Sequence, residues 1–437
     1  MRFRSACRSF AIARFLPARM SLSLANENGE DGSGAAPQRL DARIFLLALG
    51  AFAIGTDSWV MAGILRGVAQ DLSVSVEATG QVVTAYSLTY ALSAPLLAAI
   101  TAHWPWRRTI IIALIGIAGA DAVCASAGSF WIVIAGRIVA GASAGLYTPT
   151  AFAAATGLWP PTHRGAALAK VALGTTAAIV CGVPLATWIG HAFGWRITFV
   201  LGSLLAASAA ISLAASRLPM PDVVPRPSLA ERLAPITRRR VVLSLLAAVL
   251  WTSAAFTVYT YAAVIFGMRL GLDNIAVLLL GYGLGGLTGS QSGGPLVDRF
   301  GTTRPILLAF SVAALNYALM HFTGSSLLGA AAALFIMGFC AWAAWPAQQS
   351  RLVSFEPEHR PVVMSLFASA IQIGLASGSA LGGLLLANFS PAAPTYAASV
   401  ITVAGLGVFL LSNCNRLWRD IGANRTLPQE TTGRWQS

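Results

Sequence analysis

The sequence predicts an all-α membrane protein with 12 transmembrane helices in two pseudo-symmetric six-helix bundles. Hydrophobic residues make up 56% of the 437 residues and charged residues only 10%, a balance that does not describe a soluble domain. About 20 apolar residues are enough to cross a bilayer, and the chain offers such runs repeatedly. The runs form two groups of six, separated by a stretch rich in proline and arginine at 217–240.

The expected helices follow one another with short connections. They cover residues 44–65, 79–101, 108–128, 131–155, 166–188, 196–216, 241–267, 275–297, 304–324, 326–348, 361–387 and 393–413. The first six form an N-terminal bundle over 44–216, and the last six form a C-terminal bundle over 241–413. We expect the stretch at 217–240 to be a cytoplasmic linker and residues 414–437 to be a cytoplasmic tail. Two related halves around a central site are a common transporter plan.

The basic residues fix the expected orientation. The net charge of +13 would suit a nucleic-acid partner, but the basic residues lie between apolar runs and at the ends, so membrane topology explains them better. With the N-terminus inside, the outer loops contain only Arg66, Arg196 and Arg269, and Arg137 lies within the membrane. This asymmetry predicts a multi-pass protein of the inner (plasma) membrane with both termini cytoplasmic.

The first 43 residues precede the expected helices and form a separate region. Residues 1–20 contain five arginines and no acidic residue, as an organelle transit peptide does. We interpret residues 1–43 instead as a disordered basic arm, or as the result of a start assigned too early, with Met20 as the true start. No cleavable secretory signal is evident.

Short motifs recur in a fixed order along the apolar runs. They are Arg137-x-x-x-Gly141 in the fourth run, Gly174-(x7)-Gly182-Val183-Pro184 in the fifth, Gly194-Trp195-Arg196-x-x-Phe199 at the sixth, and Gly294-x-Leu296-x-Asp298-Arg299-x-Gly301 after the eighth. Their order and spacing resemble the major facilitator superfamily over about residues 44 to 413. The form of the fifth-run motif resembles the drug/proton antiporter and sugar-efflux (arabinose efflux permease type) branches.

The resemblance implies a secondary active transporter that works by alternating access. It assigns gating or structural positions to the motif residues Gly141, Gly182, Pro184, Gly294, Asp298, Arg299 and Gly301. The loop after the second run departs from the family pattern, because Ala102 stands in place of an aspartate and Pro105 in place of a glycine. That departure keeps open the alternative of a transport-inactive membrane sensor or scaffold.

Two opposite charges lie at similar depth in the membrane. At 1.5 Å per residue, Asp57 lies about 20 Å from Ile44 and about 12 Å from Leu65, and Arg137 lies about 9 Å from Trp131. An acid and an arginine at one depth can pair, which lowers the cost of burying both. We interpret Asp57 as a group that takes up and releases a proton, or meets a cationic substrate, while Arg137 tunes its pKa. The alternative is a static ion pair between the first and fourth helices.

Asp121 is a third charge within the apolar runs, near the outer third of the third run. Third helices tend to be peripheral in the resembled fold. We therefore interpret Asp121 as a residue that reaches the membrane interface, with a functional role as the alternative.

Aromatic and amide side chains in the runs are candidate substrate contacts, since aromatic groups with sparse polar groups line pockets for organic molecules. The candidates are Tyr86, Tyr90, Tyr147, Tyr259, Gln291, Trp342, Gln348 and Gln372. The alternative is ordinary packing for the aromatic residues, and hydrogen bonding to a neighbouring helix for the amides.

Several classes of function are excluded by what the sequence lacks. No GxxxxGK[ST] loop is present, the histidines and cysteines show no metal-ligand spacing, and no catalytic grouping can be assembled. We predict a monomeric, non-enzymatic transporter without cofactor or metal, whose partners are a small-molecule substrate, protons and the lipid bilayer. Proton-coupled efflux of a drug-like solute is the expected function, and efflux of a sugar or nucleoside is the alternative.

Overall fold

The computed structural model describes residues 42–101, 103–157, 164–216, 238–356 and 360–413. All regular structure in these ranges is helical. The elements are α1 (Ala42–Asp71), α2 (Val76–Ile100), α3 (Trp106–Ala125), α4 (Phe130–Gly157), α5 (Arg164–Ala177), η2 (Ala178–Gly182), α6 (Val183–Phe193), α7 (Trp195–Ala215), α9 (Arg239–Tyr259), η4 (Ala263–Gly267), α10 (Met268–Leu270), α11 (Ala276–Phe300), α12 (Thr303–Thr323), α13 (Leu327–Phe355), α14 (Arg360–Asn388) and α15 (Ala393–Asn413). Nearly all of the expected arm (1–43), linker (217–240) and tail (414–437), together with Ala102, lies outside the described residues.

The helices make 12 spans, because α5, η2 and α6 form one span and α9, η4 and α10 form another. The predicted fold class is therefore confirmed. Eleven spans in the described part of the chain are long and apolar enough to cross a membrane. The remaining span, α11, is rich in glycine and serine and ends in Asp298 and Arg299, which explains its lower hydropathy.

Helix ends follow the local sequence. Ser75 caps α2 by accepting a hydrogen bond from the backbone N–H of Ala78 at 3.1 Å, and Ser326 caps α13 in the same way. Gly301 ends α11 with a φ of 72°, a left-handed conformation that favours glycine.

The fifth span is irregular next to Pro184. Pro184 lies in the first turn of α6, directly after the π-helix η2. A π-helical turn lets the backbone before a proline adjust to the missing N–H group. Pro346, by contrast, lies inside a continuous α13.

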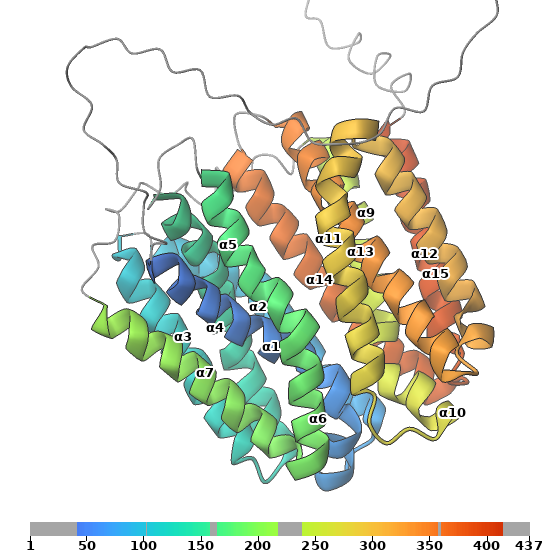
Figure 1. Ribbon diagram of the computed structural model, residues 1–437, viewed down its shortest axis with the longest axis horizontal. Coiled ribbons are helices and arrows are strands. Elements are labelled where there is room, and N and C mark those ends of the chain that lie inside the picture. The colour runs from blue at the N-terminus through green and yellow to red at the C-terminus, as the bar shows by residue number, and fades with distance from the viewer. Residues whose placement is uncertain (1–41, 102, 158–163, 217–237, 357–359, 414–437) are drawn as a thin grey trace, which may run out of the picture. The chain divides into compact units, whose positions relative to one another are not determined.

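The two halves repeat the same helix pairs (Figure 1). In the first half, α1–α7, the contacts include α2 with α4, α3 with α4, α3 with α7, and α1 with α5. In the second half, α9–α15, the equivalent contacts join α11 with α13, α12 with α13, α12 with α15, and α9 with α14. Small residues allow these close approaches, since a Cβ on Gly141 of α4 would lie 2.3 Å from the Tyr86 carbonyl oxygen of α2.

Contacts between the halves gather toward one end. We define the terminal end as the end where α1 begins and α15 ends, and the far end as the opposite one. In the described part, the hydrogen bonds between the halves lie from the middle of the helices to the far end, as from Ser379 Oγ to the Gly80 carbonyl at 2.8 Å and from Arg66 to the Leu272 carbonyl at 3.4 Å. Gly80 is needed there, because a Cβ would lie 1.8 Å from Tyr261 Oη.

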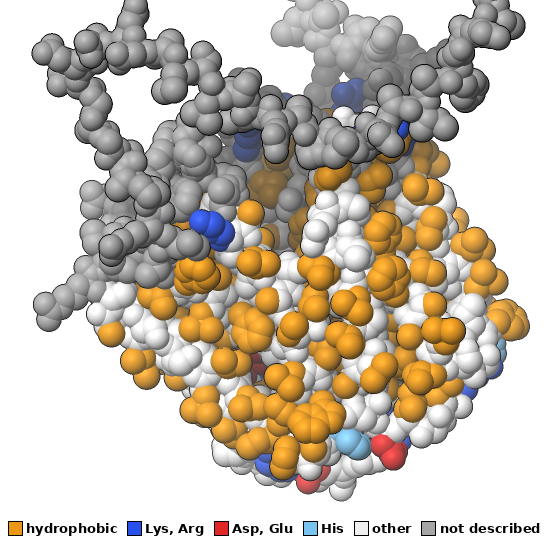
Figure 2. Space-filling view, in the orientation of Figure 1, with side chains coloured by type: hydrophobic (Ala, Val, Ile, Leu, Met, Phe, Trp, Pro, Cys, Tyr) orange, Lys and Arg blue, Asp and Glu red, His pale blue; other side chains and the backbone are white. Residues whose placement is uncertain are grey.

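The outer surface suits a bilayer. Figure 2 shows apolar side chains over the flank of the bundle, with charged groups and a histidine at its lower rim. Large apolar residues are exposed on several helices, among them Trp131, Leu308 and Leu328. Such a surface is unfavourable in water and favourable against lipid chains.

Candidate functional site

Arg137 and Asp57 form an ion pair inside the first half. Arg137 Nη1 donates to Asp57 Oδ1, and Nη2 donates to the Asp57 backbone carbonyl at 3.2 Å. Arg137 is 1% exposed and Asp57 is 4% exposed. The pairing expected from their similar depths is therefore present, and it joins α4 to α1. One buried carboxyl oxygen, Asp57 Oδ2, has no hydrogen-bond partner.

Aromatic rings enclose the guanidinium of Arg137. Its central carbon lies 4.4 Å from the ring centroid of Tyr86 on α2 and 5.7 Å from that of Phe199 on α7. Stacking of a cation on a ring stabilises the charge without needing a counter-ion. The Tyr86 hydroxyl lies 2.6 Å from Ser58 Oγ, one residue after Asp57, so the ring itself is held in place by α1.

Asp121 lies against the same guanidinium, rather than at the membrane interface. Asp121 is 0% exposed, and its Oδ1 lies 3.6 Å from Arg137 Nη1. The interface interpretation was wrong because the rotation of α3 turns this residue inward, between α4 and α7. Gly202 on α7 makes the space, since a Cβ there would lie 2.6 Å from Asp121 Oδ2.

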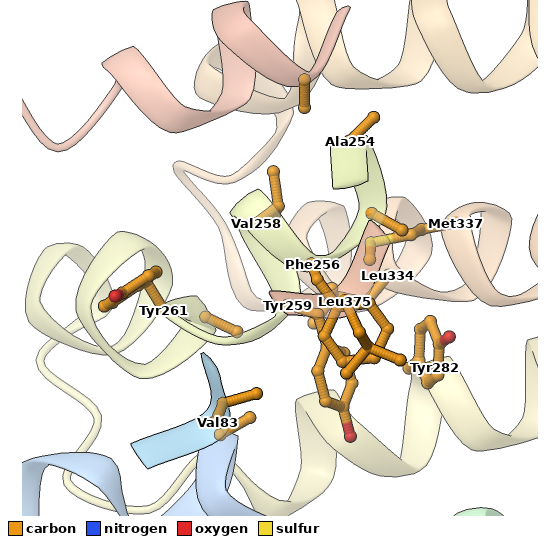
Figure 3. Close-up of a cluster of buried hydrophobic side chains, with 14 of the residues drawn as sticks. Val83, Ala254, Phe256, Val258, Tyr259, Tyr261, Tyr282, Leu334, Met337 and Leu375 are labelled. Carbon is orange, nitrogen blue, oxygen red and sulfur yellow. The ribbon is translucent and has the colours of Figure 1, made fainter. Parts of the chain in front are cut away.

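An aromatic cluster lies between the halves, around Trp59 on the same helix as Asp57. Trp59, two residues after Asp57, contacts the rings of Phe256, Tyr259, Tyr282 and Trp342 with centroid distances of 4.9, 5.4, 6.1 and 6.4 Å. Figure 3 shows Phe256, Tyr259, Tyr282 and Leu375 in the same buried hydrophobic cluster. One helix of the first half thus carries both the proton-binding acid Asp57 expected from the sequence and a ring that meets the second half.

The expected substrate contacts divide into two groups. Tyr86, Tyr259 and Trp342 belong to the surroundings of Arg137 or to the aromatic cluster. Tyr147 and Tyr90 are buried in the first half, and the Tyr147 hydroxyl donates to the Leu47 carbonyl at 2.6 Å.

The three amides expected to contact substrate lie in different surroundings. Gln291 on α11 is exposed, and Gln372 on α14 is half-buried with an unpartnered Oε1. Gln348 lines a small cavity beside Arg351. No contact in the described part of the chain joins these amides to one another.

The motif residues lie where the chain packs closely or turns. Gly182 faces α1, and a Cβ there would lie 2.2 Å from Thr56 Oγ1. Gly294 has open space beside it, and Asp298 and Arg299 are exposed at the terminal end of α11.

Trp59 and Tyr282 were missed as site residues by sequence reasoning. Trp59 is two positions from Asp57 in a helix that otherwise reads as apolar, and this proximity is the only sequence signal that would have singled it out. The partners of Trp59 come from α9 and α11, some 200 residues away, which a single sequence does not reveal.

Comparison with known proteins agrees with this architecture. The sequence model of the Major Facilitator Superfamily matches residues 47–354 and 293–428. The chain is 30% identical over 371 residues to the uncharacterized MFS-type transporter YbcL of Bacillus subtilis, covering 84% of this chain and 93% of that protein. It is 31% identical over 389 residues to the chloramphenicol efflux pump Rv0191 of Mycobacterium tuberculosis, covering 85% and 92%. It is also 29% identical to the inner membrane transport protein YdhP of Escherichia coli K12, covering 80% and 90%.

Solved structures share the fold. A bacterial homolog of the human lysosomal transporter Spinster, in an inward-facing and occupied conformation, superposes with a TM-score of 0.68 at 17% identity, covering 87% of this chain and 98% of that one. The human organic anion transporter MFSD10 gives a TM-score of 0.63 at 17% identity, covering 85% and 100%. At these identities the likeness concerns the fold.

Proposed function

The chain belongs to the major facilitator superfamily and is a secondary transporter, and on this premise we propose that it exports a small, drug-like organic solute in exchange for protons. The two halves rock about a central site by alternating access. The protein acts as a monomer in the inner membrane, with both termini in the cytoplasm. In that orientation the far end faces outward, and the contacts gathered there close the site to the outside.

The buried pair of Asp57 and Arg137 is the observation that carries the proton coupling. Ionisable groups at membrane depth are expensive to bury and mark ion or substrate pathways. Asp57 receives a proton from outside and releases it inward, and Arg137 pairs with its carboxylate between these steps.

The aromatic cluster around Trp59 supports a substrate with a flat or cationic organic group. Ring faces attract cations and stack on aromatic solutes, and Trp59 stands two residues from Asp57. A substrate that moves Trp59 therefore acts directly on the helix that holds the acid. The chloramphenicol efflux pumps among the relatives support phenicols as a first class to test, with drug-like cations as the second.

Substitution of Asp57 by Asn tests the proton coupling. Asp57→Asn keeps the size of the side chain and removes its ability to take up a proton, so transport driven by a pH gradient is abolished while the protein stays folded in the membrane. Reconstituted vesicles with an imposed pH gradient, together with size-exclusion chromatography of the purified variant, measure both outcomes. Full coupled activity of the variant would reject the proton role of Asp57.

A sugar or nucleoside substrate is the second candidate, since amides suit hydroxyl-rich solutes. The exposed position of Gln291 and the separate cavity beside Gln348 favour the drug-like solute. A transport-inactive sensor or scaffold is the alternative from another class, and solute counterflow in vesicles separates it from both. Exchange of a phenicol but not of a sugar supports the proposal, and the absence of any exchange supports the scaffold.

A further inference from the structure

One arginine and two aspartates share a single buried site in the first half. Arg137 is 1% exposed, Asp121 is 0% exposed, and Asp57 is 4% exposed. Both aspartates lie within 4 Å of the same nitrogen, Arg137 Nη1. Of the two, Asp57 receives the hydrogen bonds, one to its carboxylate and one to its backbone carbonyl.

The charges of this site do not balance when all three groups are ionised. Two carboxylates and one guanidinium sum to a charge of −1. In the described part of the chain, no cation other than Arg137 pairs with either acid, and the groups packed there are uncharged: Gly202 beside Asp121, and Tyr86 and Phe199 beside Arg137. Two carboxylates that share a site cannot both ionise easily, and an unpaired buried charge takes up a proton instead.

The unsatisfied oxygens point to the same conclusion. Both carboxyl oxygens of Asp121 and Oδ2 of Asp57 are buried without a hydrogen-bond donor. The two carboxyl groups are neighbours, because each has an oxygen within 4 Å of the same guanidinium nitrogen. A proton on Asp121 converts one acceptor into a donor, and that donor satisfies an oxygen of Asp57.

We infer that Asp121 completes a proton-binding site, in which Asp57, Asp121 and Arg137 together hold one proton on the acid that Arg137 does not engage, here Asp121. The role of this proton in transport rests on the proposed proton-coupled transport. The presence of the proton rests only on the charges of the three side chains. When Asp57 accepts a proton, the guanidinium moves from Asp57 to Asp121. One proton then enters on Asp57 and one leaves Asp121, and Arg137 keeps its charge throughout.

Geometry makes this change of partner a small movement. The second acid is already 3.6 Å from the nitrogen that now serves Asp57, so a shift of under about 1 Å brings it into hydrogen-bond range. The ring of Tyr86 supports the guanidinium from the side, and Ser58 ties this ring to the helix of Asp57. Asp121 therefore adds a proton-carrying residue from a third helix, α3, to an ion pair whose members lie on α1 and α4.

Infrared spectroscopy of the full-length purified protein at neutral pH tests the shared proton. The wild type shows the carbonyl band of a protonated carboxyl group. The band disappears in Asp121→Asn and also in Asp57→Asn, since either change leaves one acid for one arginine. The control Asp298→Asn alters an exposed acid and leaves the band in place. The inference is overturned if the wild type lacks the band or if the Asp121→Asn variant keeps it. If a variant fails to fold, the wild-type measurement still decides.

Transport in vesicles tests the role of the proton. Asp121→Asn reduces accumulation of solute driven by a pH gradient by at least about tenfold relative to the wild type. Gradient-driven accumulation equal to that of the wild type overturns the transport role of Asp121. A wild type that shows counterflow but ignores the pH gradient instead rejects the proposed proton coupling, while the infrared band still decides whether Asp121 holds a proton.

Discussion

The two halves share one architecture and differ in what they bury. Equivalent helices pack together in both, yet the first half encloses Asp57, Asp121 and Arg137, and the second encloses aromatic rings such as Trp251 and Phe310, whose centroids are 4.4 Å apart. The fold therefore does not dictate the chemistry of its centre. Each half supplies a different property, with a buried arginine between two acids on one side and ring surface on the other.

Trp59 is where these two properties meet. It belongs to α1, which carries Asp57, but its neighbours Phe256 and Tyr282 belong to the second half. A solute that binds among the rings pushes on the helix that holds the ion pair. Under the proposed function, this difference between the halves is the route from substrate binding to proton movement.

The second half also buries an arginine, and the contrast with Arg137 is informative. Arg351 donates to Ser412 Oγ at 2.6 Å and lies 4.2 Å from the ring centroid of Phe409. No acid in the described part of the chain forms an ion pair with it. A hydroxyl and a ring hold the Arg351 cation in place, whereas two acids surround Arg137 at the site to which we assign the proton.

The largest effect is expected from removing the charge that holds the first half together. Arg137→Gln leaves two buried carboxyl groups without their counter-ion, and breaking such a pair costs about 3–5 kcal/mol. Unfolding of the purified variant in detergent measures the loss. Arg299→Gln, at an exposed site on α11, should change the free energy of unfolding by less than about 0.5 kcal/mol. Equal losses in the two variants would contradict a special role for the buried arginine.

A pair of tryptophan variants separates packing from substrate binding. Trp251→Ala empties a buried site in the second half and should cost about 3–5 kcal/mol of stability while leaving the KM unchanged. Trp59→Ala removes a half-buried ring between the halves and should raise the KM about tenfold with a smaller loss of stability. Counterflow kinetics and unfolding curves give both values. The reverse pattern would place the substrate away from Trp59.

A smaller effect is expected at the closed far end. A Cβ on Gly283 would lie 2.8 Å from the Ile179 carbonyl oxygen, so Gly283→Ala should weaken contact between the halves by about 1–3 kcal/mol. Spin labels at Gln70 and Asp273, exposed on opposite halves near the far end, should then report longer distances. Gly294→Ala is the matched control, because open space surrounds that position. An unchanged distance in the first variant would show that this contact does not hold the far end closed.

The smallest effect concerns single hydroxyl groups. Tyr147→Phe removes a hydrogen bond to Leu47 within the first half, and Tyr261→Phe removes one to Ser379 at 2.9 Å, each worth about 1 kcal/mol. Tyr261 also packs on Gly80 of the opposite half. Tyr261→Phe, but not Tyr147→Phe, should therefore broaden the distribution of distances between spin labels at the far end. Similar broadening in both variants would indicate a general loosening of the protein.

Sequence reasoning predicted where residues lie along the length of each helix. This was possible because the rise per residue of a helix is constant. The expected spans match the observed helices, and the depths of Asp57 and Arg137 predicted a pair that is present. It did not predict the inward rotation of Asp121, or the dispersal of Gln291, Gln348 and Gln372 into separate surroundings. Rotation about a helix axis depends on which neighbours pack against it, and neighbours are not adjacent in the chain.

The chain on its own determined that this is a 12-helix transporter of two related halves, since apolar runs, basic loops and short motifs are local properties of the sequence. Only the tertiary structure decided which buried groups share a site. It brought a second acid to Arg137 and set Trp59 among rings of the other half. The physical reason is that a buried charge or ring is stabilised by whatever touches it, and contact is a property of packing between distant segments.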